Sequence, residues 1–203
     1  MNEVFQSILP GMMYFWVLFL GQTLMAEVVQ ERDNNTLFRI LSGPVTLSQF
    51  VLSKMLRCFV LCTVIQALLL VLCTCIFGIH WGPVHVATVI VLASALSMTG
   101  LLAFLYSFSR TKEQARVFTT IALLICALLG GSMFPFEMLP HFLQVIGQFT
   151  PNRWGVIALQ RSCQAHSFDG MGQSVVILTS IGIGGCAAGF LLFQRNFGFG
   201  GRK

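Results

Sequence analysis

The sequence predicts an all-α membrane protein, a polytopic helical bundle of about five transmembrane helices. Hydrophobic residues make up 56% of the 203 residues and charged residues only 9%, whereas a typical soluble domain has about 25% charged residues. The mean hydropathy is +0.81. Apolar runs recur at lengths near the roughly 20 residues that a helix needs to cross a bilayer. A soluble fold of this length could not bury so much apolar surface, so lipid is the expected solvent.

Five apolar segments are long enough to span a membrane, and the whole chain, residues 1–203, is predicted to form one transmembrane domain. The fourth segment is the shortest and ends at Gly130-Gly131, which indicates a broken or tilted helix. In the last segment, Gly185-x-x-x-Gly189 permits the close approach of another helix. The spans are predicted at about 6–27, 56–79, 86–108, 117–134 and 174–194, separated by loops at 28–55, 80–85, 109–116 and 135–173.

The distribution of basic residues predicts the orientation. Ten of the twelve Lys and Arg residues lie in loop 28–55 with the adjacent Arg57, in loop 109–116, or after the last span, whereas only Arg153 and Arg161 lie on the opposite side. Cytoplasmic loops carry the excess of Lys and Arg. We therefore expect a multi-pass protein of the cell (plasma or inner) membrane, with its C-terminus in the cytoplasm and its N-terminus outside. No Lys/Arg-rich run with interleaved aromatic residues is present, so nucleic-acid binding is not expected.

Loop 28–55 carries the start and stop signals of a short amphipathic helix. Residues 33–35 offer Asp and Asn caps, and Gly43-Pro44 would end the helix with Gly43 in the left-handed conformation. Residues 46–49 match a capping box that starts the next helix. The apolar face of the short helix would consist of Leu37, Ile40 and Leu41. The alternative is a solvated connector that is anchored at the membrane interface.

Loop 135–173 predicts two short helices that dip into the outer interface or re-enter it. Pro135 and Pro140 bracket a turn, and Trp154 and Trp81 are expected at headgroup depth. Apolar residues recur at helical spacing on both sides of the break at 150–152: Phe142, Leu143, Ile146 and Phe149 before it, and Trp154, Ile157 and Ala158 after it.

Several kinds of chemistry have no support in the sequence. No charged residue lies in the middle of a predicted span, which disfavours ion-coupled transport. The polar groups that can hydrogen-bond between helices are Gln22, Thr23, Gln66, Ser94, Ser97 and Thr99. No P-loop is present, so the chain is not expected to hydrolyse ATP, and no motif of an intramembrane protease occurs. The seven cysteines and four histidines match no metal-site spacing. We expect no catalytic residue, no metal and no cofactor in this chain.

An ordered set of motifs covering about residues 4–194 resembles the permeases, or membrane subunits, of ABC-2 type transporters, which belong to ABC exporters. The motifs are Leu9-Pro10-Gly11, the segment from Glu31 to Pro44 followed by Lys54, the segment from Gly130 to Pro135, Met138-Leu139-Pro140, and the segment from Thr150 to Trp154. Asn35 stands where the family usually has Gly, and Asn tolerates a positive φ better than other non-Gly residues.

The resemblance implies a cytoplasmic coupling helix that docks on an ABC ATPase subunit, which would bind ATP and Mg. It implies a second permease copy or a sister permease as a further partner, beside membrane lipid. The implied cargo is a hydrophobic or amphiphilic compound such as a drug, an antibiotic or a lipid-like molecule. The implied coupling residues are Glu31, Arg32, Thr36, Leu37, Arg39 and Leu41, and the implied outer re-entrant motif comprises Gly130, Gly131, Pro135, Pro140, Pro151 and Trp154.

Compared with the six spans of that family, this chain is expected to lack the first one. The alternative function is therefore that of a truncated, non-transporting membrane protein that associates with a full-length permease or modulates it.

Overall fold

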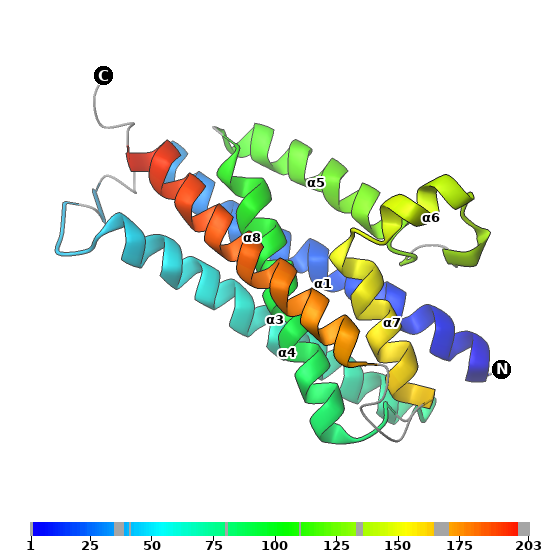
Figure 1. Cartoon of the computed structure of the whole chain (residues 1–203). Helices are drawn as coiled ribbons and strands as arrows, with labels where there is room; N and C mark the ends of the chain where they lie inside the picture. Colours follow the sequence, from blue (N-terminus) through cyan, green and yellow to red (C-terminus); the bar gives the residue numbers. More distant parts are fainter. Residues whose placement is uncertain are drawn as a thin grey trace.

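The computed structural model describes residues 2–34, 39–40, 42–79, 81–109, 111–132, 136–164 and 171–198. Within these ranges all regular structure is helical and no strand occurs, so the predicted all-α fold class is confirmed. Figure 1 shows the helices packed side by side as a bundle. Their bounds are α1 Asn2–Asp33, α3 Leu47–Phe77, α4 Val84–Ser107, α5 Lys112–Leu129, the 3-10 helix η1 Phe136–Met138, α6 His141–Gly147, α7 Pro151–Gln164 and α8 Gly172–Gly198.

Four helices in the described part of the chain are long and apolar enough to cross a membrane. They are α1 over Leu9–Glu31, α3, α4, and α8 over Gly172–Asn196. The fourth predicted span corresponds to α5, which has 18 residues and contains Lys112, Glu113 and Arg116 in its first turns. α5 ends at Leu129, at the predicted Gly130-Gly131 break and before the predicted limit of residue 134.

The connection between α1 and α3 is shorter than the predicted loop 28–55. α1 continues to Asp33, and α3 already begins at Leu47. The capping box is confirmed: the Gln49 backbone N–H donates to Thr46 Oγ1 at 3.3 Å, and the Thr46 N–H donates to Gln49 Oε1 at 3.0 Å. The prediction of a left-handed conformation at Gly43 is wrong. Among the described glycines, positive φ angles occur at Gly78, Gly82 and Gly131 but not at Gly43.

The most extensive helix–helix contact joins α4 and α8. Glycines on both helices bring the two backbones together. A Cβ placed on Gly185 would lie 2.7 Å from the Gly100 carbonyl carbon, and one placed on Gly189 would lie 2.8 Å from that of Ala103. Gly182 likewise abuts the backbone of Ser97. The spacing Gly185-x-x-x-Gly189 thus lies in the α4 contact, where only small residues fit.

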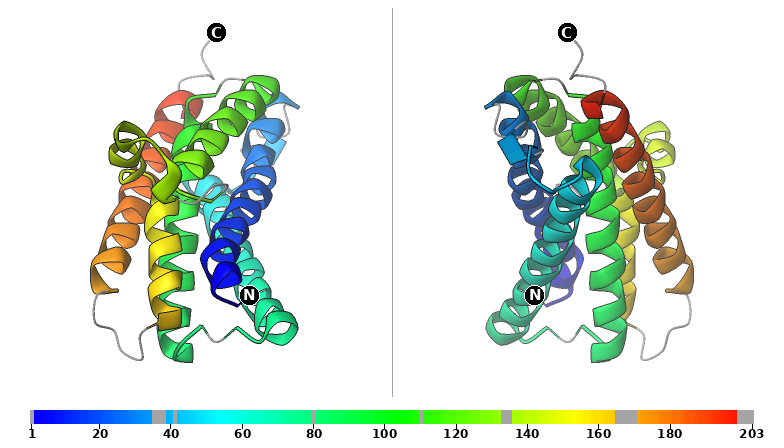
Figure 2. Two further views of the ribbon diagram at one scale, coloured as in Figure 1. Left: turned by 90° about the vertical axis from the view of Figure 1, so that its right-hand side faces the viewer. Right: turned by 90° about the vertical axis from the view of Figure 1, so that its left-hand side faces the viewer.

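α5 and α7 together make one passage along the bundle. In Figure 2, α5 runs from the end where α8 stops to the middle of the molecule, and α7 continues from there to the opposite end. Asn152 in the first turn of α7 donates a hydrogen bond from Nδ2 to Ser132 Oγ, just after α5. Ser162 Oγ, near the other end of α7, donates to the Trp81 carbonyl at 2.5 Å, in the α3–α4 connection. α7 is therefore held at both ends.

Candidate functional site

Two helices meet through paired charges at the end of the bundle where α1 stops and α3 starts. Lys54 Nζ lies 2.8 Å from Glu31 Oε1 and 3.4 Å from Glu27 Oε2. Arg57 Nη1 lies 2.6 Å from Glu27 Oε2. We call Glu27, Glu31, Lys54 and Arg57 the α1–α3 charge cluster. It fixes the ends of the two helices that flank the connection 34–46.

The centre of this cluster is partly withdrawn from solvent. The Lys54 side chain is 15% exposed and the Glu31 side chain 27%, and Lys54 Nζ also lies 5.7 Å from the centre of the Phe50 ring. Charges with restricted access to water attract one another more strongly than exposed ones, and each is costly to leave unpaired. Removal of one partner from the pairs involving Lys54 should therefore cost more than removal of one partner from an exposed ion pair.

The predicted coupling residues are distributed over two places. Glu31 and Arg32 lie in the last turn of α1, not in a separate short helix. The helix α1 extends beyond the apolar segment. Its final turns contain Glu27 and Glu31, which are spaced i, i+4 and therefore lie on one face. Both carboxylates form ion pairs with Lys54 of α3, which stabilises these turns. Arg39 is exposed in a helical turn. The remaining predicted coupling residues, Thr36, Leu37 and Leu41, lie outside the described residues.

The predicted outer re-entrant motif is brought together where α5 ends and α7 begins. Gly130 caps α5, and a Cβ placed on it would lie 2.8 Å from Asn152 Cβ. Gly131 follows with φ 76°, a conformation that suits glycine. Pro151 is the first residue of α7, where a missing N–H does no harm. These positions let the chain turn sharply between the two helices.

The other residues of this motif hold the segment around α6. Pro140 is the N-cap of α6, and Trp154 Nε1 donates to the Gln148 carbonyl at 2.7 Å. Arg153 lies 3.6 Å above the centre of the Phe136 ring, so the guanidinium binds an aromatic face. Pro135 lies outside the described residues.

Packing against other helices determines which side chains of the outer segment are buried. Trp81 is buried and donates from Nε1 to the Leu70 carbonyl at 3.2 Å, so its ring contacts protein. On α7, Ala158 of the predicted apolar spacing is buried, whereas Trp154 and Ile157 are only half-buried. The buried face of α7 also includes Val156, Leu159 and Ser162. The buried face of α7 follows its contacts with α1, α4 and α8, which the apolar spacing alone does not specify.

Three of the six predicted polar groups in the spans, Gln22, Gln66 and Ser94, form hydrogen bonds between helices, whereas Thr23 Oγ1 donates to the Leu20 carbonyl within α1. Ser94 Oγ donates to Gln66 Oε1 at 2.6 Å, linking α4 to α3. Gln22 Nε2 donates to Thr120 Oγ1 at 2.7 Å, linking α1 to α5, and Tyr106 donates to the Gln22 carbonyl at 3.1 Å. Among the described residues, no group of three His, Cys, Asp or Glu side chains is placed to hold a metal ion.

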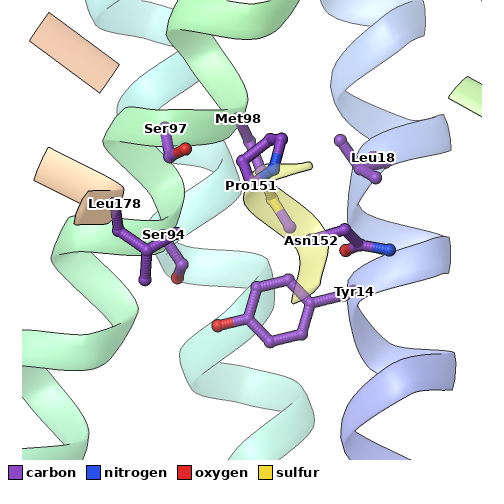
Figure 3. A pocket seen from close by; sticks show the side chains of 8 residues that line it. All are labelled: Tyr14, Leu18, Ser94, Ser97, Met98, Pro151, Asn152 and Leu178. Atoms are coloured by element: carbon purple, nitrogen blue, oxygen red, sulfur yellow. The ribbon is translucent and has the colours of Figure 1, made fainter. Parts of the chain in front are cut away.

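Sequence reasoning missed Glu27 and Tyr14. The i, i+4 spacing of Glu27 and Glu31, together with the i, i+3 spacing of Lys54 and Arg57, was a signal for two complementary helix faces. Tyr14 carried no such signal, because its neighbours come from distant parts of the chain (Figure 3).

Comparison with known proteins identifies the family. A family model described as "ABC-2 family transporter protein" matches residues 1–192. The chain belongs to this ABC-2 transporter family. The resemblance noted from the sequence motifs is thereby confirmed. ABC-2 permeases are membrane subunits that are not themselves catalytic.

One curated relative is the linearmycin resistance permease protein LnrN of Bacillus subtilis (strain 168). The two chains are 26% identical over 148 residues, which cover 71% of this chain and 38% of that protein. The present chain thus spans well under two thirds of the length of this relative. Together with its apolar helices, family membership makes the chain a multi-pass membrane protein.

Proposed function

We propose that this protein is the membrane subunit of an ATP-driven exporter, moved by a separate ABC ATPase that acts on the connection between α1 and α3. Membership in the ABC-2 family supports the transport role. The α1–α3 charge cluster is the observation that supports this route, because it joins the helices on both sides of the connection. A force applied to the connection would move α1 and α3 as a pair.

The proposed mechanism follows the packing of these helices. α1 also contacts α4, α5 and α7, so a displacement of the α1–α3 pair would reach the α5–α7 break. The partner ATPase would bind ATP and Mg, and a second permease copy or a sister permease would complete the pathway. The connection would lie in the cytoplasm, as the distribution of Lys and Arg predicts.

The proposed cargo is a hydrophobic or amphiphilic compound, for example a drug, an antibiotic or a lipid-like molecule. The fully buried polar side chains in the described part of the chain are hydroxyls and amides, without a charged group. Such an interior favours neutral over ionic cargo. The name of the linearmycin resistance permease supports the antibiotic class.

Arg39→Glu tests the proposed docking surface. Arg39 is exposed, so the variant should retain its apparent Tm, while reversal of its charge should reduce the amount of ABC ATPase that co-purifies with the tagged protein from its native host. Arg161→Glu, an exposed position at the far end of α7, is the control and should leave the co-purified ATPase unchanged.

Full ATPase recovery and full export activity in the Arg39→Glu variant would contradict docking at this connection. Recovery of a longer permease without any ABC ATPase would instead support the non-transporting, modulating role.

A further inference from the structure

The last turn of α8 joins the ends of two other helices. Gln194 Nε2 donates a hydrogen bond to Ser48 Oγ at 2.9 Å, and Asn196 Nδ2 donates one to the Ser107 carbonyl, also at 2.9 Å. Ser48 is the second residue of α3, and Ser107 is the last residue of α4. These partners lie 146 and 89 positions away in the sequence. One turn of α8 therefore connects α3 and α4 at the end of the bundle that contains the α1–α3 charge cluster.

The bond from Asn196 strengthens a contact that already exists. The last four carbonyl groups of a helix have no partner within that helix, and the Ser107 carbonyl is one of them. α8 also packs along α4 through Gly185 and Gly189. α8 would therefore stay against α4 without this bond.

The bond from Gln194 is different, because α3 and α8 have little other contact. In both views of Figure 2 the two helices are closest at the end where α8 stops, and they diverge toward the opposite end. Their contact is far smaller than that between α4 and α8. Ser48 and Gln194 are both half-buried, so water competes less for their hydrogen bond than on an open surface. Gln194 thus provides a polar link between α3 and α8 where packing provides little.

This link holds the part of α3 that adjoins the connection between α1 and α3. Thr46 is the N-cap of α3, so Ser48 follows the connection by two residues. The charge cluster holds α3 at Lys54, which lies more than one turn further along the helix. The ends of helices fray most readily. A tether at Ser48 therefore determines where the first turn of α3, and the exposed residues 42–46 before it, lie relative to the bundle.

We propose that Gln194 is a positioning residue for the ATPase-docking surface: through Ser48 it fixes the start of α3, and with it the adjoining part of the connection that the ABC ATPase recognises. This inference rests on the proposed function, because it requires that the ATPase docks on the connection. It adds α8 to the helices that support this surface, beside α1 and α3. A surface that is already ordered costs less to bind, so loss of the bond should weaken docking without removing a contact residue.

Recovery of the ABC ATPase with the tagged full chain from its native host tests the positioning role. Gln194→Ala should lower the recovered ATPase by roughly two- to tenfold, the fold-change equivalent of one net hydrogen bond. Ser48→Ala should give the same reduction, and the double variant should show no further loss, because both changes remove one bond. Ser48→Thr retains a hydroxyl and should retain full recovery.

Asn196→Ala is the matched control, because it removes an amide hydrogen bond of the same length from the same turn, directed to α4 instead of α3. Both amide variants should lower the apparent Tm by a similar, small amount, whereas only Gln194→Ala should lose ATPase. Equal ATPase losses in the two amide variants would overturn the positioning role. Additive losses in the Ser48 and Gln194 double variant would do so as well.

The outcomes also separate the positioning role from the proposed function. Full recovery in Gln194→Ala together with a loss in Arg39→Glu would refute the positioning role and leave the docking surface in place. Full recovery in both variants would refute docking at the connection, and the positioning role with it.

Discussion

At the scale of single residues, Lys54 stands out because two carboxylates converge on one ammonium group. Its replacement by Ala would leave the half-buried Glu31 carboxylate without its cation. We expect Lys54→Ala to destabilise the protein by about 1.5–3 kcal/mol, the range for hydrogen bonds to charged groups. The measurement is the apparent Tm of the purified protein in detergent.

Arg57→Ala is the matched control for Lys54→Ala. Arg57 forms an ion pair with Glu27, and both side chains are more exposed than Lys54. An exposed ion pair contributes about 0.2–1 kcal/mol, so this variant should lose clearly less stability. Equal losses in the two variants would mean that the burial of Lys54 has no influence on the strength of the cluster.

The residue scale also shows what sequence reasoning could and could not reach. The capping box at Thr46 was predictable because donor and acceptor lie three positions apart on one chain segment. The Glu31–Lys54 pair spans 23 positions and depends on how two helices cross. Spacing places charges on one face of each helix, but the partner of that face is decided by tertiary packing.

At the scale of elements, the α4–α8 contact depends on glycines, because their lack of a Cβ atom lets the two helix backbones approach closely. Gly185→Leu would push a side chain into the Gly100 backbone, which cannot move aside as a flexible side chain would. We expect a loss of about 1–3 kcal/mol or more, measured as a lower apparent Tm. Gly184→Leu is the neighbouring control, because a Cβ at that position would meet nothing within 4 Å, and it should change stability by less than about 0.5 kcal/mol.

The α3–α4 connection offers a second comparison between two glycines. Gly78 and Gly82 have φ angles of 63° and 77°, so an Ala at either position is strained. A Cβ on Gly78 meets nothing within 4 Å, whereas one on Gly82 would lie 2.4 Å from the Ser162 carbonyl oxygen of α7. Gly78→Ala should cost about 1–2 kcal/mol from backbone strain alone.

Gly82→Ala should cost more than Gly78→Ala, because it also displaces the end of α7. Thermal unfolding of both variants measures the difference. Similar apparent Tm values for the two variants would show that displacing the end of α7 does not lower the stability of the protein.

The elements themselves were only partly predictable. Apolar length indicated α1, α3, α4 and α8, because lipid selects long apolar helices. The break after α5 was indicated by Gly130-Gly131. Trp81 and the buried face of α7 were not predictable in the same way, because a residue that could face lipid or protein has the same apolar character in either place. The Trp81 indole N–H donates to the Leu70 carbonyl, and no sequence pattern predicts this hydrogen bond.

At the scale of the whole molecule, the described basic residues other than Arg153, which is at the start of α7, separate along the bundle axis. Lys54, Arg57 and Arg116 belong to the end where α8 stops, whereas Arg161 lies near the far end of α7 (Figure 2). Arg39→Cys and Arg161→Cys, each in a background without native cysteines, test the orientation. A membrane-impermeant maleimide should label the Arg161→Cys variant in intact cells and the Arg39→Cys variant only after permeabilisation. The reverse pattern would invert the orientation and remove the basis for cytoplasmic docking.

The helix α3 presents an apolar surface on the outside of the bundle. One face of α3 is apolar and exposed along its whole length, through Leu52, Leu56, Val60, Val64, Leu68, Val71, Leu72 and Ile76. The recurrence at every fourth position places these side chains on one stripe. We expect this stripe to contact lipid acyl chains.

The passage formed by α5 and α7 has a consequence for how the protein is made. Neither helix is long and apolar enough to count among the candidate spans in the described chain. A translocon sorts each nascent segment by its own hydrophobicity. Neither α5 nor α7 is therefore expected to insert into the bilayer as an independent span. These helices would have to enter the bilayer by docking on α1 and α4, which are already inserted when α5 is synthesised. Complete assembly would also require α8, which is translated after α7, because it contacts both α4 and α7. Biogenesis would then follow an order in which the broken passage is the last part to mature.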